Sequence, residues 1–356
     1  GVPQSELPFC VDPKEGFVCT ANGQPEVNGT GPFLGVDFLD GFRVSAITER
    51  LAARADFTLD ACRELQADTE SLPWRELRDE VLSIAPGTPE QKQALVLLAA
   101  WDGRVAHDSL AASVYELFVA SMCRRIVTAK APRSARFALG GGFFKKLMPH
   151  SMLMFRRLGH FIQLLRDETP GFFPKGWHVE MGDALHETVK ALTDEHGNFA
   201  NWSWGRVRPF TLVHPLGEKR PLDALFNLGP FPGCGDATTI WQGAVDLNHP
   251  TGQPVAIPTL RTVIDVGDWD QSRFVLLGGQ SGNPFSPHYG DQVALWQRAE
   301  GIPIAWSKDN VASQSPLVQF TTDHPTFKNA KASSPILAII ESSAFGRQFD
   351  DLAALL

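Results

Sequence analysis

Three residues of the types that form a hydrolytic triad lie close together late in the chain. Ser281, His288 and Asp291 fall within eleven positions of one another. In a serine hydrolase the hydroxyl attacks, the imidazole takes its proton and the carboxylate orients the imidazole. Here Gly and Pro impose turns around Ser281, and no strand-to-helix elbow that would expose a nucleophile is indicated. The pattern therefore argues against an ordinary serine hydrolase acting through Ser281.

Asn22 and Arg43 are the other candidates. A fixed carboxamide donor stabilises an oxyanion that exists only in the transition state, an effect of roughly a hundred- to a thousandfold in rate. Asn22-Gly23 is equally the preferred dipeptide of a type I′ hairpin turn. Arg43, at the start of an expected helix, could serve a site or pair with a surface carboxylate such as Asp40, a contact worth under about 1 kcal/mol. The residues alone leave both choices open.

Five ordered segments carry a resemblance that spans residues from about 10 to about 306. They are Asp12-Pro13 with Glu15-Gly16-Phe17-Val18 and Thr20-Ala21-Asn22; Leu39-Asp40-Gly41-Phe42-Arg43 with Ile47; Trp202-Ser203-Trp204-Gly205 with Phe210 and His214-Pro215-Leu216; Pro232-Gly233-Cys234-Gly235-Asp236; and Gly278-Gly279-Gln280-Ser281-Gly282-Asn283-Pro284 with Ser286-Pro287-His288-Tyr289 and Asp291-Gln292. In this order they resemble the DPxxGFxxTANN, GYRxxRI, WxWGxxHxxxFxHPL, PxGGDG and GGQSGNPxSPHYxDQ motifs of the penicillin acylase (penicillin amidase) family of N-terminal-nucleophile hydrolases.

The resemblance implies an amidase made by autoproteolytic cleavage of a precursor. Cleavage leaves a Ser, Thr or Cys as the first residue of the large subunit, and its free α-amine activates its own side chain. This chain begins with Gly1, and the DPxxGFxxTANN segment normally lies well inside the large subunit. The resemblance thus implies the C-terminal part of the large (beta) subunit, with the nucleophilic Ser outside this chain. The implied partners are the rest of that subunit, the small subunit and a small-molecule amide substrate.

By the same resemblance, Asn22 would be the oxyanion donor and Arg43 would lie near the nucleophile. The GGQSGNP segment would be structural, and His214 would be packed beside Trp204. Arg208 stands where the family motif has His. No substrate-binding residue is predicted, because the acyl pocket would be built mostly by the missing part.

The family's structural calcium is not supported by this sequence. Pro32 takes the place of one of its carboxylates, and the nearest carboxylate, Asp37, is displaced. No other cofactor and no metal site is expected. The implied location is periplasmic or secreted.

The expected function is therefore part of an amidohydrolase that cleaves a linear amide by acyl transfer and is inactive as this fragment alone. A non-catalytic scaffold or binding fragment is the alternative. The family's substrates include β-lactam side chains, glutaryl groups, acyl-homoserine lactones and lipopeptide acyl tails, and the sequence does not choose among them.

The elements that would position these residues follow from periodicity and capping. Short apolar runs between Gly, Pro and Asn predict strands before residue 40. Helices are predicted from Arg43, after a Thr58 cap, after a capping box at Thr88 to Gln91, after Asp108 or Ser109, and over 183–195; the stretch 143–165 reads as two more. Strands are predicted at 210–213, 238–245, 259–266 and 274–277.

This order predicts an α+β fold. Residues 1–42 would supply strands and the oxyanion site, 43–198 a mainly helical insertion, and 199–356 a strand-rich region with the GGQSGNP segment. The resemblance implies that the strands belong to a four-layer αββα sandwich. An isolated fragment of such a sandwich should expose an apolar sheet face or self-associate.

Composition limits the class of protein. The net charge is −8 with a pI near 5.7, and Lys and Arg are scattered, which argues against nucleic acid as a partner. No stretch approaches twenty apolar residues, so no membrane span is expected. The five cysteines have no spacing suited to zinc, and a disulfide between Cys10 and Cys19 is left open.

Overall fold

The computed structural model of the chain describes residues 1–25, 31–144, 147–151 and 158–313. Contacts divide the chain into two units, residues 1–304 and 305–356. The described part of the second unit contains one short helix, α12 (Lys308–Ser313). Everything below concerns the first unit. The division into three regions at residues 42 and 198 stays a prediction.

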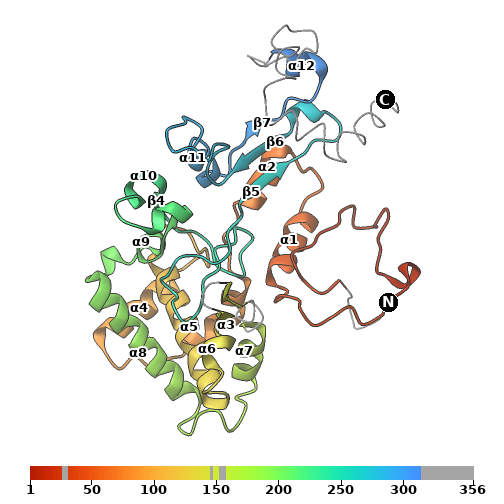
Figure 1. Cartoon of the computed structure of the whole chain (residues 1–356). Helices are drawn as coiled ribbons and strands as arrows, with labels where there is room; N and C mark the ends of the chain where they lie inside the picture. Colours follow the sequence, from red (N-terminus) through yellow and green to blue (C-terminus); the bar gives the residue numbers. More distant parts are fainter. Residues whose placement is uncertain (26–30, 145–146, 152–157, 314–356) are drawn as a thin grey trace. The chain divides into compact units, whose positions relative to one another are not determined.

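A body of helices forms the main core (Figure 1). Its elements are α3 (Leu72–Leu82), α4 (Pro89–Ala99), α5 (Leu110–Lys130), α6 (Ala135–Ala138), α7 (Leu158–Arg166) and α8 (Trp177–His196). Of the two helices that precede it, α1 (Phe42–Ala52) contacts α3, and α2 (Leu59–Gln66) packs against β5 (Leu260–Val263). The α5 helix is buried on nearly all sides, because it packs against α4, α7 and α8. A helix that is apolar all round is expected at the centre of a core. Figure 1 shows α8 running beside α5.

The predicted caps of these helices are confirmed. Thr58 accepts a hydrogen bond from the Ala61 N–H and starts α2. Thr88 and Gln91 form both halves of a capping box at α4, and Ser109 caps α5. Each cap satisfies backbone donors that the first turn of a helix leaves free.

The stretch 143–165 departs from the prediction of two helices. Its first part belongs to an antiparallel pair, β1 (Gly141–Phe144) and β2 (Met148–His150), and among the described residues of the stretch only α7 is helical. Adding a Cβ to Gly142 would bring it within 1.7 Å of the Met148 carbonyl oxygen. The glycine therefore permits the close approach of the β1 and β2 backbones. The apolar pattern of the stretch did not predict this pairing.

The later strands form small antiparallel sheets. Strand β3 (Pro209–Leu212) pairs with β4 (Leu228–Pro232), and β6 (Arg273–Leu276) lies between β5 (Leu260–Val263) and β7 (Ile302–Pro303). The short helices α9 (Trp204–Val207), α10 (Asp223–Phe226) and α11 (Val293–Gln297) lie among them in sequence. Three of the four predicted strands are thus confirmed: β3 and β6 begin and end one residue earlier than predicted, and β5 is shorter than the predicted 259–266.

The fourth predicted strand, over 238–245, does not form. The Asp236 carboxylate accepts hydrogen bonds from the backbone N–H groups of Thr238 and Thr239, at 2.6 and 2.8 Å, and from the Thr238 hydroxyl. The Thr239 hydroxyl then donates to the Trp241 carbonyl oxygen at 2.6 Å. Local side-chain bonds of this kind compete with a strand ladder.

The start of the chain is irregular. Within residues 1–25 and 31–41, the structure has one short 3₁₀ turn, Gln4–Glu6, and no strand. Apolar side chains stay exposed there, including Phe9 at 83% and Phe33 at 79%. The strands predicted for this segment are absent from these residues, and its exposed apolar surface is not a sheet face. A strand forms only with a neighbouring strand to bond, which this segment does not have in the described chain.

The fold is therefore mixed helix and strand, as predicted. The described residues contain two two-stranded sheets and one three-stranded sheet. That these strands belong to a four-layer sandwich stays a prediction. None of the helices described is both long and apolar enough to span a bilayer.

Candidate functional site

The segment around Asn22 is held against the first turns of α1. The Cys19 thiol donates to the Val44 carbonyl oxygen at 3.6 Å and lies 3.4 Å from the Thr48 hydroxyl. The Leu39 N–H donates to the Asn22 carbonyl oxygen at 2.9 Å. These bonds fix the backbone on both sides of the Asn22 carboxamide.

Arg43 then binds Asn22 directly. Its Nη2 atom donates to Oδ1 of Asn22 at 2.8 Å and to the Ala21 carbonyl oxygen at 3.0 Å. Burial lowers the pKa of the Arg43 guanidinium, although an arginine keeps its charge at any ordinary pH. The structure thus brings the two predicted site residues together.

Asp40, the surface partner considered for Arg43, has a different role in the fold. Its carboxylate accepts hydrogen bonds from the N–H groups of Leu158 and Gly159, at 2.9 and 3.2 Å, at the start of α7. A negative charge at a helix N-terminus is favourable. Asp40 therefore joins the Asn22 region to the helical body.

The contact with Arg43 fixes how the Asn22 amide points. Because Oδ1 accepts from Arg43, the Nδ2 group with its two N–H donors is directed away from the guanidinium, and the Asn22 side chain is exposed. A charged donor on Oδ1 also polarises the amide and strengthens Nδ2 as a donor. Asn22 has a positive φ of 61°, whereas Gly23 does not. A type I′ turn requires positive φ at both residues, so the hairpin interpretation of Asn22-Gly23 is wrong.

Ser281, His288 and Asp291 do not form a triad. The Ser281 hydroxyl accepts from the Asn283 N–H at 3.1 Å, and the Ser281 N–H donates to the His288 carbonyl oxygen. His288 Nδ1 lies 2.9 Å from Asp291 Oδ2. Within the described structure the His288 ring makes no hydrogen bond to the Ser281 hydroxyl.

The same loop is tied to β6 and β4 through other residues. The Gln292 side chain accepts from the Leu276 N–H at 2.8 Å, and the Tyr289 hydroxyl donates to the Phe226 carbonyl oxygen. A Cβ at Gly290 would lie 2.9 Å from the Leu228 side chain. These contacts fit the structural role expected for the segment.

His214 is packed, but not beside Trp204 as predicted. Its ring stacks on Phe226 at 4.8 Å, and its Nδ1 atom accepts from the Leu216 N–H. The place beside the Trp204 indole is taken by Arg208, whose guanidinium carbon lies 4.8 Å from the ring centre.

Two ionisable side chains of the interior, Glu116 and Arg208, were not predicted from the sequence to lie there. Burial, followed by the hydrogen-bonded Asp236 carboxylate, raises the pKa of Glu116 well above its ordinary value. Arg208 is 1% exposed, and desolvation lowers its pKa to about 10. The available signal was a single carboxylate inside the apolar sequence of α5.

Among the described residues, no three His, Cys, Asp or Glu side chains gather in a way that could hold a metal ion. All five cysteines are free thiols, so Cys10 and Cys19 form no disulfide in this structure.

Comparison with known proteins decides the family. A family model described as penicillin amidase matches residues 1–313. The chain belongs to the penicillin amidase family. Penicillin acylase 2 proenzyme of Pseudomonas sp. (strain SE83) is 32% identical over 318 residues, covering 88% of this chain and 39% of that protein. Acyl-homoserine lactone acylase QuiP of Pseudomonas aeruginosa is 23% identical over 335 residues, covering 84% of this chain and 38% of that protein.

A solved structure supports the fold of this penicillin amidase family member. A thermostable penicillin G acylase from Alcaligenes faecalis superposes with a TM-score of 0.50 at 18% identity, covering 88% of this chain and 58% of that one. The N-terminal-nucleophile hydrolase fold of that enzyme is therefore shared over most of this chain. The chain spans about two fifths of the length of the two curated relatives.

Proposed function

We propose that this chain supplies the oxyanion-binding part of an amidohydrolase that cleaves a linear amide by acyl transfer to an N-terminal Ser outside the chain. The observation that carries the proposal is the 2.8 Å hydrogen bond from Arg43 to Asn22 Oδ1. Within the described residues the side-chain N–H donors of Asn22 are left available for a ligand. Membership of the penicillin amidase family supports the reaction class.

The chemistry follows from that geometry. Attack of a hydroxyl on the amide carbon forms a tetrahedral intermediate whose oxygen carries a negative charge. Nδ2 of Asn22 donates to this oxygen, and Arg43 holds the amide in place before the charge develops. Preorganised donors need no reorganisation at the moment of reaction, which makes them effective. Asn22 and Arg43 carry no acid or nucleophile, so this pair alone has no turnover.

The partners in this proposal are the remainder of the large subunit and the small subunit of one precursor. The exposed apolar side chains of residues 1–41 support the idea that this segment is covered in the whole protein. Covering exposed apolar surface stabilises by about 25 cal/mol per Å². One relative is named penicillin acylase 2 proenzyme, which supports processing from a precursor. A periplasmic or secreted location is part of the same proposal.

The test uses the precursor-length protein with Asn22→Ala and Asn22→Asp. Both changes should lower kcat about a hundred- to a thousandfold, since each removes one oxyanion donor. A penicillin and an acyl-homoserine lactone are suitable substrates, because two relatives of this chain are named penicillin acylase and acyl-homoserine lactone acylase. Mass spectrometry of the subunits checks that processing is intact.

Asn198→Ala is a matched control, because it also removes a carboxamide from a turn, where Asn198 accepts from the Ala200 N–H. It should leave kcat unchanged. If the Asn22 variants are processed normally and keep full activity, the proposal fails. If the unaltered precursor is neither processed nor active on any amide, the scaffold alternative is favoured instead.

A further inference from the structure

A cavity of about 440 Å³ lies apart from the Asn22 site, and neither Asn22 nor Arg43 lines it. It is bounded by residues from the loop before α5, from β3 and β4, and from α11. Its volume is in the range of sites for small molecules. The proposed function makes no use of it.

The apolar walls of this cavity are rigidly built. They include the aromatic side chains of Phe210, Trp241 and Trp296. The Arg261 guanidinium carbon lies 4.0 Å from the Trp241 ring centre and 4.2 Å from that of Trp296, and its Nη1 atom donates to the Trp296 carbonyl oxygen at 2.8 Å. The two indoles also contact each other edge to face, with their ring centres 5.2 Å apart, so an arginine that lies against both rings helps to fix them.

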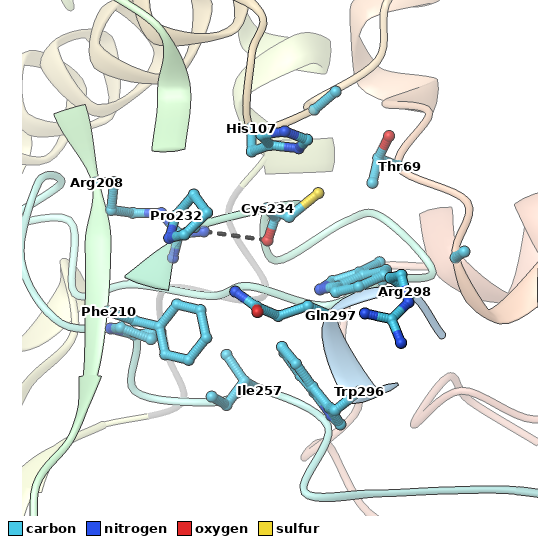
Figure 2. A pocket seen from close by; sticks show the side chains of 15 residues that line it. Thr69, His107, Arg208, Phe210, Pro232, Cys234, Ile257, Trp296, Gln297 and Arg298 are labelled. Carbon is cyan, nitrogen blue, oxygen red and sulfur yellow. Dashed lines mark hydrogen bonds between the residues drawn. The ribbon is translucent and has the colours of Figure 1, made fainter. Parts of the chain in front are cut away.

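The polar part of the wall is rich in nitrogen donors. His107, Arg208, Gln297 and Arg298 line the cavity, and no Asp or Glu is among its lining residues. Figure 2 shows Arg208 and Arg298 on opposite sides, with Cys234 and Gln297 between them. Arg298 is exposed and forms an ion pair with Glu300 at 2.8 Å.

Arg208 has an unused donor. Its Nη1 atom donates to the Gly243 carbonyl oxygen at 2.8 Å, and Nη2 donates to those of Cys234 and Gly235 at 3.2 and 3.0 Å. The Nε atom is buried and has no hydrogen-bond partner in the described structure. Buried donors are nearly always paired, and one without a partner requires an explanation.

We propose that this cavity binds a small carboxylate with an aromatic or aliphatic body, the carboxylate accepting from Arg208 and the body lying against Phe210, Trp241 and Trp296. The mixture of apolar walls, basic groups and no acidic lining suits an anion with an apolar tail. Glu116 and Asp236 also contribute to the field at Arg208. Burial raises the pKa of Glu116 well above its ordinary value, which reduces the negative charge that competes with the ligand.

The test is calorimetric titration of the full chain with 3-phenylpropionate and with its neutral amide. The two probes have the same apolar body and differ in the charge of the head group. We expect the carboxylate to bind at least about tenfold more tightly, as one charge-assisted hydrogen bond provides. Equal binding of the amide, or no binding of either probe, would overturn the proposal.

Two variants locate the site. Arg208→Met should remove the preference for the carboxylate, whereas Arg206→Met, which loses an exposed arginine two residues away, should keep it. If Arg208→Met does not fold, Ala67→Leu decides, because Ala67 lines the cavity and a larger side chain fills it. Unchanged binding of 3-phenylpropionate by a folded Ala67→Leu chain would place the ligand elsewhere.

Discussion

Removal of the Arg43 guanidinium tests whether the Asn22 amide acts as a preorganised donor. In Arg43→Met, the Asn22 Oδ1 atom loses the donor 2.8 Å away and Ala21 loses the one at 3.0 Å. A hydrogen bond to a charged group contributes about 1.5–3 kcal/mol. If that energy orients the amide, its loss corresponds to a fall in kcat of about ten- to a hundredfold, since about 1.4 kcal/mol is tenfold.

The assay is steady-state kinetics of the precursor-length protein. KM should stay unchanged, because the oxyanion exists only beyond the ground state. Arg43→Lys keeps the charge but offers a compact ammonium in place of a planar fork, so its kcat should lie between those of the wild type and Arg43→Met.

The decisive measurement is a double-mutant cycle. If Arg43 acts through Asn22, the double variant Asn22→Ala/Arg43→Met should be no slower than Asn22→Ala alone. If the loss of kcat in the double variant equals the product of the losses in the two single variants, this reasoning is refuted. Full activity of the single variant Arg43→Met, with Asn22→Ala slow, would refute it as well.

Three further predictions concern the body of the chain. Burial and Asp236 raise the pKa of Glu116, so the native state should lose stability as pH rises from the ordinary glutamate range through the raised pKa. Glu116→Gln should reduce the slope of the free energy of unfolding against pH, measured by urea unfolding at several pH values. An unchanged slope would contradict the assignment. Arg208→Met should lower the free energy of unfolding by about 3–5 kcal/mol, because three carbonyl groups lose a buried charged donor; denaturant midpoints of this variant and wild type would check it, and a loss below about 1 kcal/mol would count against it. A fluorophosphonate probe should not label Ser281, whose hydroxyl has no contact with the His288 ring in the described structure; labelling lost in Ser281→Ala would disprove this.

Helix starts were the most predictable feature of the fold. Thr58, Thr88 and Ser109 act through bonds that span only three residues, so the local sequence contains everything that decides them. The strand at 238–245 failed for the opposite reason. The Asp236 carboxylate binds backbone N–H groups that a strand would need for pairing, and a run of apolar residues does not indicate such a competing bond.

The site was predictable in one respect only. Asn22 and Arg43 were singled out by motif resemblance, because Asn-Gly by itself indicates a turn. The 2.8 Å contact between them depends on how residues 19–23 lie along α1. The spacing of residues in the sequence does not predict that path. The burial of Arg208 was not predictable, since a charged residue is read from sequence as a surface residue. For Glu116 the one signal was its place as the single carboxylate in the apolar sequence of α5.

Gly23 follows Asn22 where the resembled motif has a second Asn, and this has a chemical consequence. With no side chain at residue 23, no Cβ of that residue hinders its peptide nitrogen from attacking the neighbouring carboxamide carbon. This attack expels ammonia and gives a succinimide, which water then opens to aspartate or isoaspartate. The product carboxylate can only accept hydrogen bonds at neutral pH. Slow deamidation on storage should therefore silence the donor without unfolding the chain, and peptide mapping for isoaspartate at this position would detect it.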